Sequence, residues 1–178
     1  MKKFLTRFIL VSVIAFTAGC GLAGTGDVQQ TPSGSQQLGN DTVEITLYFD
    51  YDEAMYLKPE KRTVKKAGKP MAKLLVQELI SGPQTKGLSK TIPEVTRLIS
   101  LEVADGVAVA NFSREIKTRH PGGTAGERMT VQSIVHTLVQ LPEIDKVQFL
   151  IEGEKEEAIW GHIYTAEPIV PDERVLAR

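Results

Sequence analysis

Residues 98–113 read LISLEVADGVAVANFS, and this stretch decides the fold. Apolar residues dominate on both sides of Asp105-Gly106, a dipeptide that favours the left-handed backbone of a two-residue hairpin turn. The stretch therefore predicts two antiparallel strands, 98–103 and 107–112. Because an isolated hairpin is only marginally stable in water, the neighbouring segments must supply helices or further strands that cover it.

The chain that follows predicts a helix. Residues 113–121 read as a polar connection, and Gly122-Gly123 gives a flexible entry. Thr124 and Glu127 have the spacing of a capping box, in which each side chain bonds the other residue's backbone. An apolar stripe with helical spacing follows and ends before Pro142. Its members are either Met129 or Val131, and then Ile134, Val135, Leu138 and Leu141.

Beyond this helix, Val147, Phe149 and Ile151 alternate with other residues and predict another strand. Residues 160–164 are candidates for a last strand. The tail, residues 166–178, contains prolines and charges, and we expect it to fray.

The upstream segments complete the pattern. Apolar residues at every second position of 43–49 predict a half-buried strand. Residues 62–65 are candidates for a short strand, and their basic side chains suit an exposed sheet edge. Pro70 suits the start of a helix whose apolar stripe covers 71–80, and Gly82-Pro83 ends it.

Together these elements predict an α+β domain at residues 43–165, with two helices packed on a small, mainly antiparallel sheet. Aromatic residues make up only 6% of the chain, so we expect a core of Val, Ile and Leu. Residues 166–178 form a separate C-terminal tail in this division of the chain.

The amino terminus reads as a signal peptide over residues 1–19. Three basic residues precede an apolar core at 8–18, which has the length of a signal-peptide core and is too short for a membrane span. Thr17-Ala18-Gly19 and then Cys20 look like a bacterial lipobox, although Leu is commoner than Thr at the third position before the cysteine. The resemblance implies that Cys20 carries lipid. The alternative is an ordinary secretory signal with an incidental cysteine.

Residues 20–42 are expected to be the lipidated cysteine and a flexible tether. Gly, Ser, Thr, Gln and Asn dominate this segment, so it has little to bury. Three of the 21 Lys and Arg residues lie in the signal peptide, which leaves 18 bases and 22 acids. This mildly acidic balance argues against a nucleic-acid binder.

No group of residues has the pattern of a catalytic, cofactor or metal site. His120, His136 and His162 match no metal-ligand spacing, and His136 is expected at the surface or at its boundary. Asp50 and Asp52 lack the further oxygen ligands of a calcium loop. The acidic residues of 152–157 read as an exposed charged turn rather than a glycosidase pair. We therefore expect a protein that is not an enzyme and has no cofactor.

Four blocks resemble the GerM (GerMN) domain family of sporulation and spore germination. They are VEITLYFD at 43–50, LLVQELISGP at 74–83, IPEVTRLISLEVADGVAVANFS at 92–113 and GGTAGERMTVQSIVHTLVQLPEIDKVQFLIEG at 122–153. The resemblance implies a fold similar to ring-building motif domains and a place in the bacterial envelope. Some members have two such domains in tandem, whereas this chain has room for one.

Three functions follow from these patterns. The first is a membrane-tethered module that binds an envelope protein in sporulation or germination. The second is a peptidoglycan-binding module, with Tyr48, Tyr56 or Trp160 stacking on sugars. The third is an envelope hydrolase, which the absence of a catalytic motif disfavours. The patterns do not decide between ring assembly and a monomer.

The lipid on Cys20 is directly testable in a bacterial host. We expect metabolic labelling with a fatty acid to mark the wild-type chain, and Cys20→Ala to abolish the label because the thiol is the attachment point. Globomycin should cause the uncleaved precursor to accumulate. A wild-type protein recovered from the medium with an unmodified Cys20 would contradict lipid anchoring.

Overall fold

The hairpin predicted from Asp105-Gly106 forms the core of a three-stranded sheet. The computed structural model describes residues 41–178. In it β3 (Leu98–Ala104) pairs antiparallel with β4 (Val107–Phe112), and both turn residues have positive φ, 50° and 76°. On the other side of β4 lies β5 (Lys146–Ile151), which runs parallel to it. A parallel neighbour needs a long crossover, and residues 113–145 provide it.

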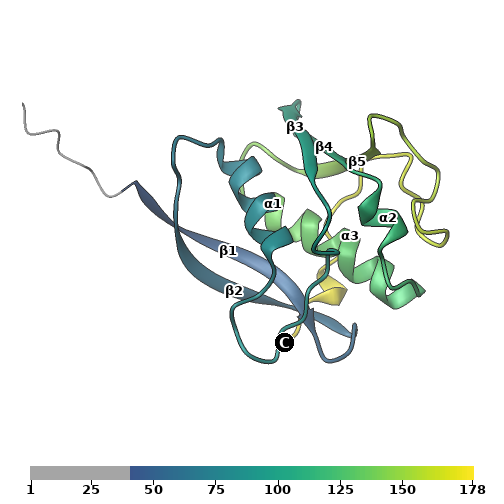
Figure 1. Ribbon diagram of the computed structural model, residues 1–178, viewed down its shortest axis with the longest axis horizontal. Coiled ribbons are helices and arrows are strands. Elements are labelled where there is room, and N and C mark those ends of the chain that lie inside the picture. The colour runs from purple at the N-terminus through teal and green to yellow at the C-terminus, as the bar shows by residue number, and fades with distance from the viewer. Residues whose placement is uncertain (1–40) are drawn as a thin grey trace, which may run out of the picture. The chain divides into compact units, whose positions relative to one another are not determined.

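A second sheet consists of two long strands (Figure 1). β1 (Thr42–Tyr51) pairs antiparallel with β2 (Tyr56–Lys65) along its whole length. The sequence predicted only a short strand at 62–65, but β2 has 10 residues. The turn between the two strands contains three residues with a left-handed backbone: Asp52, Glu53 and Ala54. None of them is Gly, so the sequence lacks the usual signature of such a turn.

Three helices cover these sheets. α1 (Met71–Ser81) has the predicted limits, and the Gly82 N–H donates to the Leu79 carbonyl, 3.1 Å away. α2 (Glu115–Thr118) is a single turn within the predicted polar connection. α3 (Thr124–Leu138) packs against α1, β1, β2 and β5. The prediction of an α+β fold with helices on small, mainly antiparallel sheets is confirmed, although the strands form two sheets.

The core is formed mainly by aliphatic residues, as predicted, but three phenylalanines are among its largest fully buried side chains: Phe49, Phe112 and Phe149. The rings of Phe112 and Phe149 stack with centroids 6.4 Å apart, across the parallel β4–β5 pair. One aromatic residue thus comes from the two-stranded sheet and two from the three-stranded sheet.

α3 is buried on all sides in its second half. Every residue from Met129 to Leu138 is buried, although several of them are polar. Gln132 accepts from the backbone N–H of Asp172 at 2.9 Å and donates to the carbonyl of Val170. The Thr137 hydroxyl accepts from the backbone N–H of Tyr48 at 3.1 Å. The polar side chains therefore bond α3 to β1 and to the C-terminal segment, as buried polar groups require.

The tail is ordered, and the prediction that it frays is wrong. Ile169 pairs with Val147 through two backbone hydrogen bonds, at the outer edge of β5. A short 3₁₀ turn, Glu173–Val175, places Val175 in the core with 1% of its surface exposed. The Ala177 N–H then donates to the Leu57 carbonyl at 2.9 Å. The segment thus joins both sheets.

Two further local predictions are wrong. The N-cap of α3 is Gly123, with no side-chain capping bond, so Thr124 and Glu127 form no capping box. Gly123 has φ 83°, and the helix begins at Thr124, one residue earlier than a Thr124 cap would require. Residues 160–163 form bends and Tyr164 has no regular structure, so residues 160–164 are not a strand. Trp160 instead donates from Nε1 to the Ile116 carbonyl at 3.0 Å.

The prediction of an exposed basic edge at residues 62–65 holds only in part, because not all basic residues of β2 face solvent. Arg62 is buried and pairs with buried Glu60 through Nε at 2.9 Å. Glu60 also accepts from the N–H groups of Gln84 and Thr85, and Arg62 donates to the Gly82 carbonyl. Arg62 also pairs with Glu78, in the last turn of α1, at 3.3 Å. The ion pair therefore joins β2 to the last turn of α1 and to the residues that directly follow this helix.

We expect Glu60→Gln to lower the free energy of unfolding by about 3 kcal/mol, because it leaves the buried Arg62 guanidinium without its main counterion. Chemical denaturation measures this loss. The control is Glu44→Gln, which removes the exposed Glu44–Lys61 pair at 3.5 Å and should change stability by less than about 0.5 kcal/mol. Equal effects of the two substitutions would contradict the role of burial.

The same variant should change the response to acid. Burial raises the pKa of Glu60, but hydrogen bonds from Thr85 and Arg62 outweigh it, so the pKa lies below the usual 4.5. The unfolded chain therefore binds more protons at low pH, and this stabilisation, present above the unfolded pKa, is lost as pH falls through the folded one. Between about pH 6 and pH 3, wild type should lose more stability than Glu60→Gln.

Candidate interaction surfaces

The outer side of β3 is an open sheet edge. The sheet order is β3-β4-β5, so within the described part of the chain no strand pairs with this side of β3. Three apolar side chains on β3 and the turn before it are exposed: Val95 by 55%, Ile99 by 53% and Val103 by 39%. We call these three residues the β3 surface. The register shifts at Ile99, so the strand is bulged there and regular from Ser100 onward.

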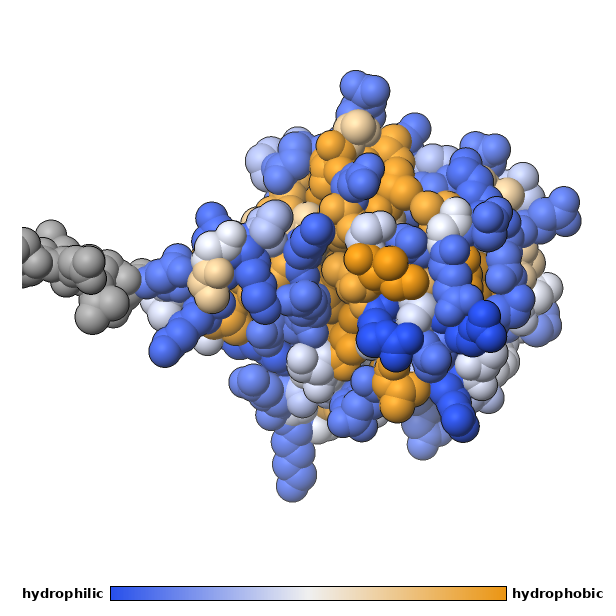
Figure 2. Space-filling view, turned by 45° about the horizontal axis from the view of Figure 1, so that its top comes forward, coloured by the Kyte–Doolittle hydropathy of each residue, from blue (hydrophilic) through white to orange (hydrophobic). Residues whose placement is uncertain are grey.

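Charged residues alternate with this apolar surface. Arg97 is largely exposed and forms a long ion pair with Glu115, 3.8 Å apart, and Glu102 is exposed on the strand itself. Figure 2 shows hydrophobic surface gathered in a central band of the face in view, bordered by polar and charged residues. An edge with exposed apolar side chains is a template for an added strand.

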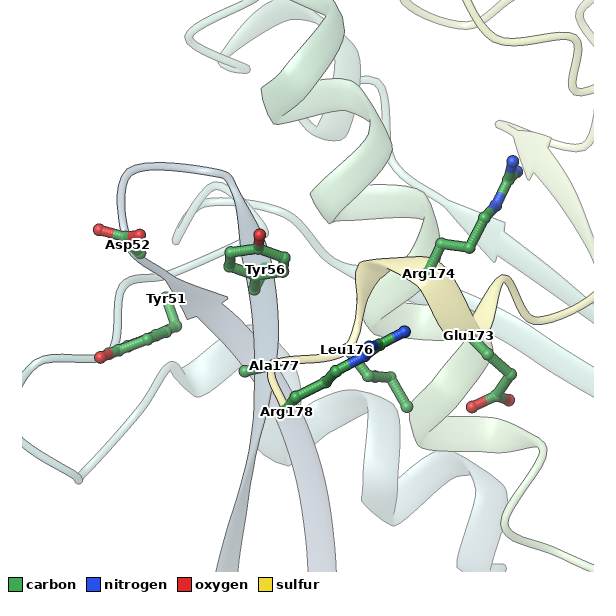
Figure 3. Close-up of a pocket in the computed structure, with 8 residues that line it drawn as sticks. All are labelled: Tyr51, Asp52, Tyr56, Glu173, Arg174, Leu176, Ala177 and Arg178. Carbon is green, nitrogen blue, oxygen red and sulfur yellow. The ribbon is translucent and has the colours of Figure 1, made fainter.

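A cavity of about 510 Å³ lies between the β1–β2 turn and the C-terminal segment (Figure 3). Tyr51 and Tyr56 line one side; they are directly opposite each other at the end of the hairpin. Arg178 and Leu176 line the other side. The Tyr51 ring has the Lys58 ammonium 4.7 Å from its centroid. The cavity therefore combines two aromatic rings with charged groups.

A second cavity, of about 500 Å³, lies between residues 90–94 and the start of α3. Its polar groups already have partners within the chain. Lys90 pairs with Glu94 at 3.2 Å, and Asp50 accepts from the Ala54 N–H at 2.9 Å. Burial raises the pKa of Asp50 above its usual value. Few polar groups remain in this cavity to orient a ligand.

His120, which also lines the second cavity, uses both ring nitrogens. Nδ1 accepts from the Gly122 N–H at 2.9 Å, which assigns the proton to Nε2, 2.8 Å from the Thr130 hydroxyl. Burial lowers the pKa of His120, although nearby Glu127 opposes this effect. The ring is therefore held neutral, and it packs against Trp160 with centroids 5.3 Å apart.

The other two histidines also have structural partners. The Glu127 carboxylate is 1% exposed and lies 2.7 Å from His162 Nδ1, and it also accepts from the His162 backbone. His136 is buried, contrary to the predicted surface position, because it packs beside Tyr48 and its Nε2 lies 3.2 Å from the Asp172 carbonyl. Among residues 41–178, no group of three or more His, Cys, Asp or Glu side chains could hold a metal ion.

The acidic turn at 152–157 is bound to α2 and its N-cap through ion pairs. Arg114 makes a bidentate ion pair with Glu152, in which Nη2 lies 2.6 Å from the carboxylate. Lys117 pairs with Glu156. The hydrogen bond to Arg114 lowers the pKa of Glu152. Asp52, in the other acidic turn, lies at the first cavity instead. Neither turn brings two carboxylates together around a ligand site.

Of the three aromatic residues predicted to stack on sugars, only Tyr56 lines the first cavity. Tyr48 packs beside His136, and its backbone N–H is bonded to α3. Trp160 is held by its bond to Ile116. Tyr51 was not predicted; the signal was its position opposite Tyr56 across the turn, which becomes visible only once β2 is recognised as a strand.

Cys20 lies outside the described residues, as do the predicted signal peptide and nearly all of the predicted tether. Within the described part of the chain, no helix combines the length and the apolar character that a membrane span requires.

Comparison with known proteins identifies relatives of this domain. A family model described as sporulation and spore germination, named Germane, matches residues 46–157. The first GerMN domain of the sporulation protein GerM from Bacillus subtilis is 27% identical, with a TM-score of 0.58, over 76% of this chain and 98% of that structure. No match was found among curated proteins.

Two further structures are similar. A predicted lipoprotein from Clostridium perfringens is 27% identical, with a TM-score of 0.52, over 72% of this chain and 87% of its own. The tandem GerMN domains of Bacillus subtilis GerM share the fold, with 21% identity and a TM-score of 0.63 over 88% of this chain. This chain spans about half of that tandem structure, or 51%. The chain belongs to the Germane family of sporulation and spore germination proteins.

Proposed function

We propose that this chain is an envelope lipoprotein, held at the cell membrane by lipid on Cys20, whose domain binds another envelope protein in sporulation or germination. The family supports the cellular process. The amino-terminal pattern and the similarity to a predicted lipoprotein support the anchor.

The observation that carries the binding role is the β3 surface. A complete domain has no stability reason to expose Ile99 and Val103 on an open edge, since such edges promote association and are usually blunted. The occupant that fits is an extended segment of a partner protein, which adds a strand beside β3 and packs apolar side chains on these two residues. Arg97 and Glu102, of opposite charge, would fix its register.

Action by binding rather than by catalysis is part of this proposal. The three histidines and the acidic residues of 152–157 that face α2 have partners that explain them structurally. A catalytic base would instead have to lie within hydrogen-bond distance of a substrate bound in a cleft.

A peptidoglycan-binding module is the second candidate, and the Tyr51–Tyr56 cavity favours it. Sedimentation of the purified chain with insoluble peptidoglycan tests this function as a whole. Recovery of the chain in the supernatant at every wall concentration would count against it.

The strand-addition proposal predicts a loss of crosslinking. A photo-crosslinking residue placed at Glu102 should form a discrete adduct with one envelope protein in living cells. We expect Ile99→Lys combined with Val103→Lys to lower the adduct yield at least about ten-fold, because two charges would be buried against the added strand.

The matched control is Val170→Lys, which changes an apolar residue that is 59% exposed outside the β3 surface and should leave the yield unchanged. Circular dichroism and thermal unfolding verify that each variant folds. An undiminished adduct in the double variant would exclude the β3 surface as the interface.

A further inference from the structure

We infer that the Tyr51–Tyr56 cavity is a saccharide subsite that takes the glycan strand of the cell wall. The inference deepens the second candidate function above and does not depend on the β3 surface. A volume of about 510 Å³ lies within the range of small-ligand sites and suits one or two sugar rings.

The two tyrosines provide the stacking surface. Tyr51 is 39% exposed and Tyr56 38%, so neither ring is needed to fill the core. As directly opposed residues of an antiparallel pair, they project from the same face of the hairpin. An aromatic face carries negative charge, which attracts the slightly positive C–H groups on the apolar face of a pyranose ring.

Polar groups around the rings match the hydroxyl and amide groups of a sugar. Asp52 beside the turn supplies an acceptor, and Arg178 on the opposite wall supplies donors. Arg174 is engaged elsewhere: it donates to Asp172 at 2.8 Å and 3.0 Å. Figure 3 agrees, since the Arg174 guanidinium points away from the two rings; Arg178 extends past Leu176 toward the side of Glu173. A ligand with both hydroxyl and carbonyl groups can donate a hydrogen bond to Asp52 and accept one from Arg178.

The walls are held in place before any ligand binds. The bond from Ala177 to the Leu57 carbonyl and the buried Val175 fix the C-terminal wall. The Lys58 ammonium over the Tyr51 ring restrains the other wall. Such preorganisation reduces the entropy lost on binding.

The cavity lies at the tip of the β1–β2 hairpin. The preceding chain enters the domain at Thr42, the first residue of β1, and Tyr51 is the last. A strand of this length spans about 30 Å. The cavity therefore lies at the opposite end of the β1–β2 hairpin from Thr42.

The test uses the full-length chain, purified in mild detergent, with a β-1,4-linked N-acetylglucosamine tetramer as the probe. Saturation-transfer NMR should show transfer to the ring protons of the sugar, and calorimetry should give the affinity. We expect Tyr51→Ala or Tyr56→Ala to weaken binding at least about ten-fold, and Tyr56→Phe to retain it because the ring remains.

Tyr164→Ala is the matched control, because Tyr164 is 60% exposed and lies outside the cavity. Its affinity should equal that of wild type, and thermal unfolding should show that all variants fold. No binding at millimolar tetramer, or equal binding by the two cavity variants, would overturn the inference. Binding of stem peptides alone would also overturn it. Cys20→Ala should bind the tetramer unchanged, so a failure of lipid anchoring is distinguishable from a failure of this site.

Discussion

The complete burial of the second half of α3 is the constraint on which the other elements depend. A helix that contains Thr130, Gln132, Ser133, His136 and Thr137 cannot be buried by apolar packing alone. Each of these side chains meets a partner, among them the Thr91 hydroxyl 2.7 Å from Ser133 and the Thr91 carbonyl that Thr130 bonds. β1, the C-terminal segment and the loop at residue 91 are thus positioned by hydrogen bonds from one helix as well as by hydrophobic contact.

The candidate interaction sites lie where this arrangement ends. α3 and α1 cover the inner parts of the sheets, which leaves the outer side of β3 and the tip of the β1–β2 hairpin exposed. Both places hold residues that the core does not use, apolar in one case and aromatic in the other. A rigid domain that presents binding groups at its margins can engage a partner with little change in its own structure.

Local sequence patterns predicted the elements whose formation depends on neighbouring residues. Asp105-Gly106 fixed the β3–β4 hairpin because its backbone preference is local, and the apolar stripe of α1 was bounded by Pro70 and Gly82. The predictions that failed concern residues whose partners are distant in the sequence. Arg62 and Glu60 have the sequence pattern of exposed strand residues, and their burial depends on partners 16 to 25 residues away, at Glu78, Gly82, Gln84 and Thr85.

The same reason explains the errors around α3. Glu127 has the spacing of a capping residue, yet it bonds His162, 35 residues away. His136 reads as a surface residue because the carbonyl of Asp172 that accompanies its burial lies 36 residues further on. The cavity escaped prediction because one wall is formed by a segment whose charges and prolines resemble a disordered tail.

The packing of residues 169–177 has a consequence for the order of events during synthesis. These last residues complete both sheets, since Ile169 pairs with Val147 and Ala177 bonds Leu57. A ribosome makes β1 and β2 more than 100 residues before this segment. The domain therefore lacks part of its hydrogen bonding and the buried Val175 side chain until residue 177 has been synthesised, so the earlier segments cannot complete their native packing before then.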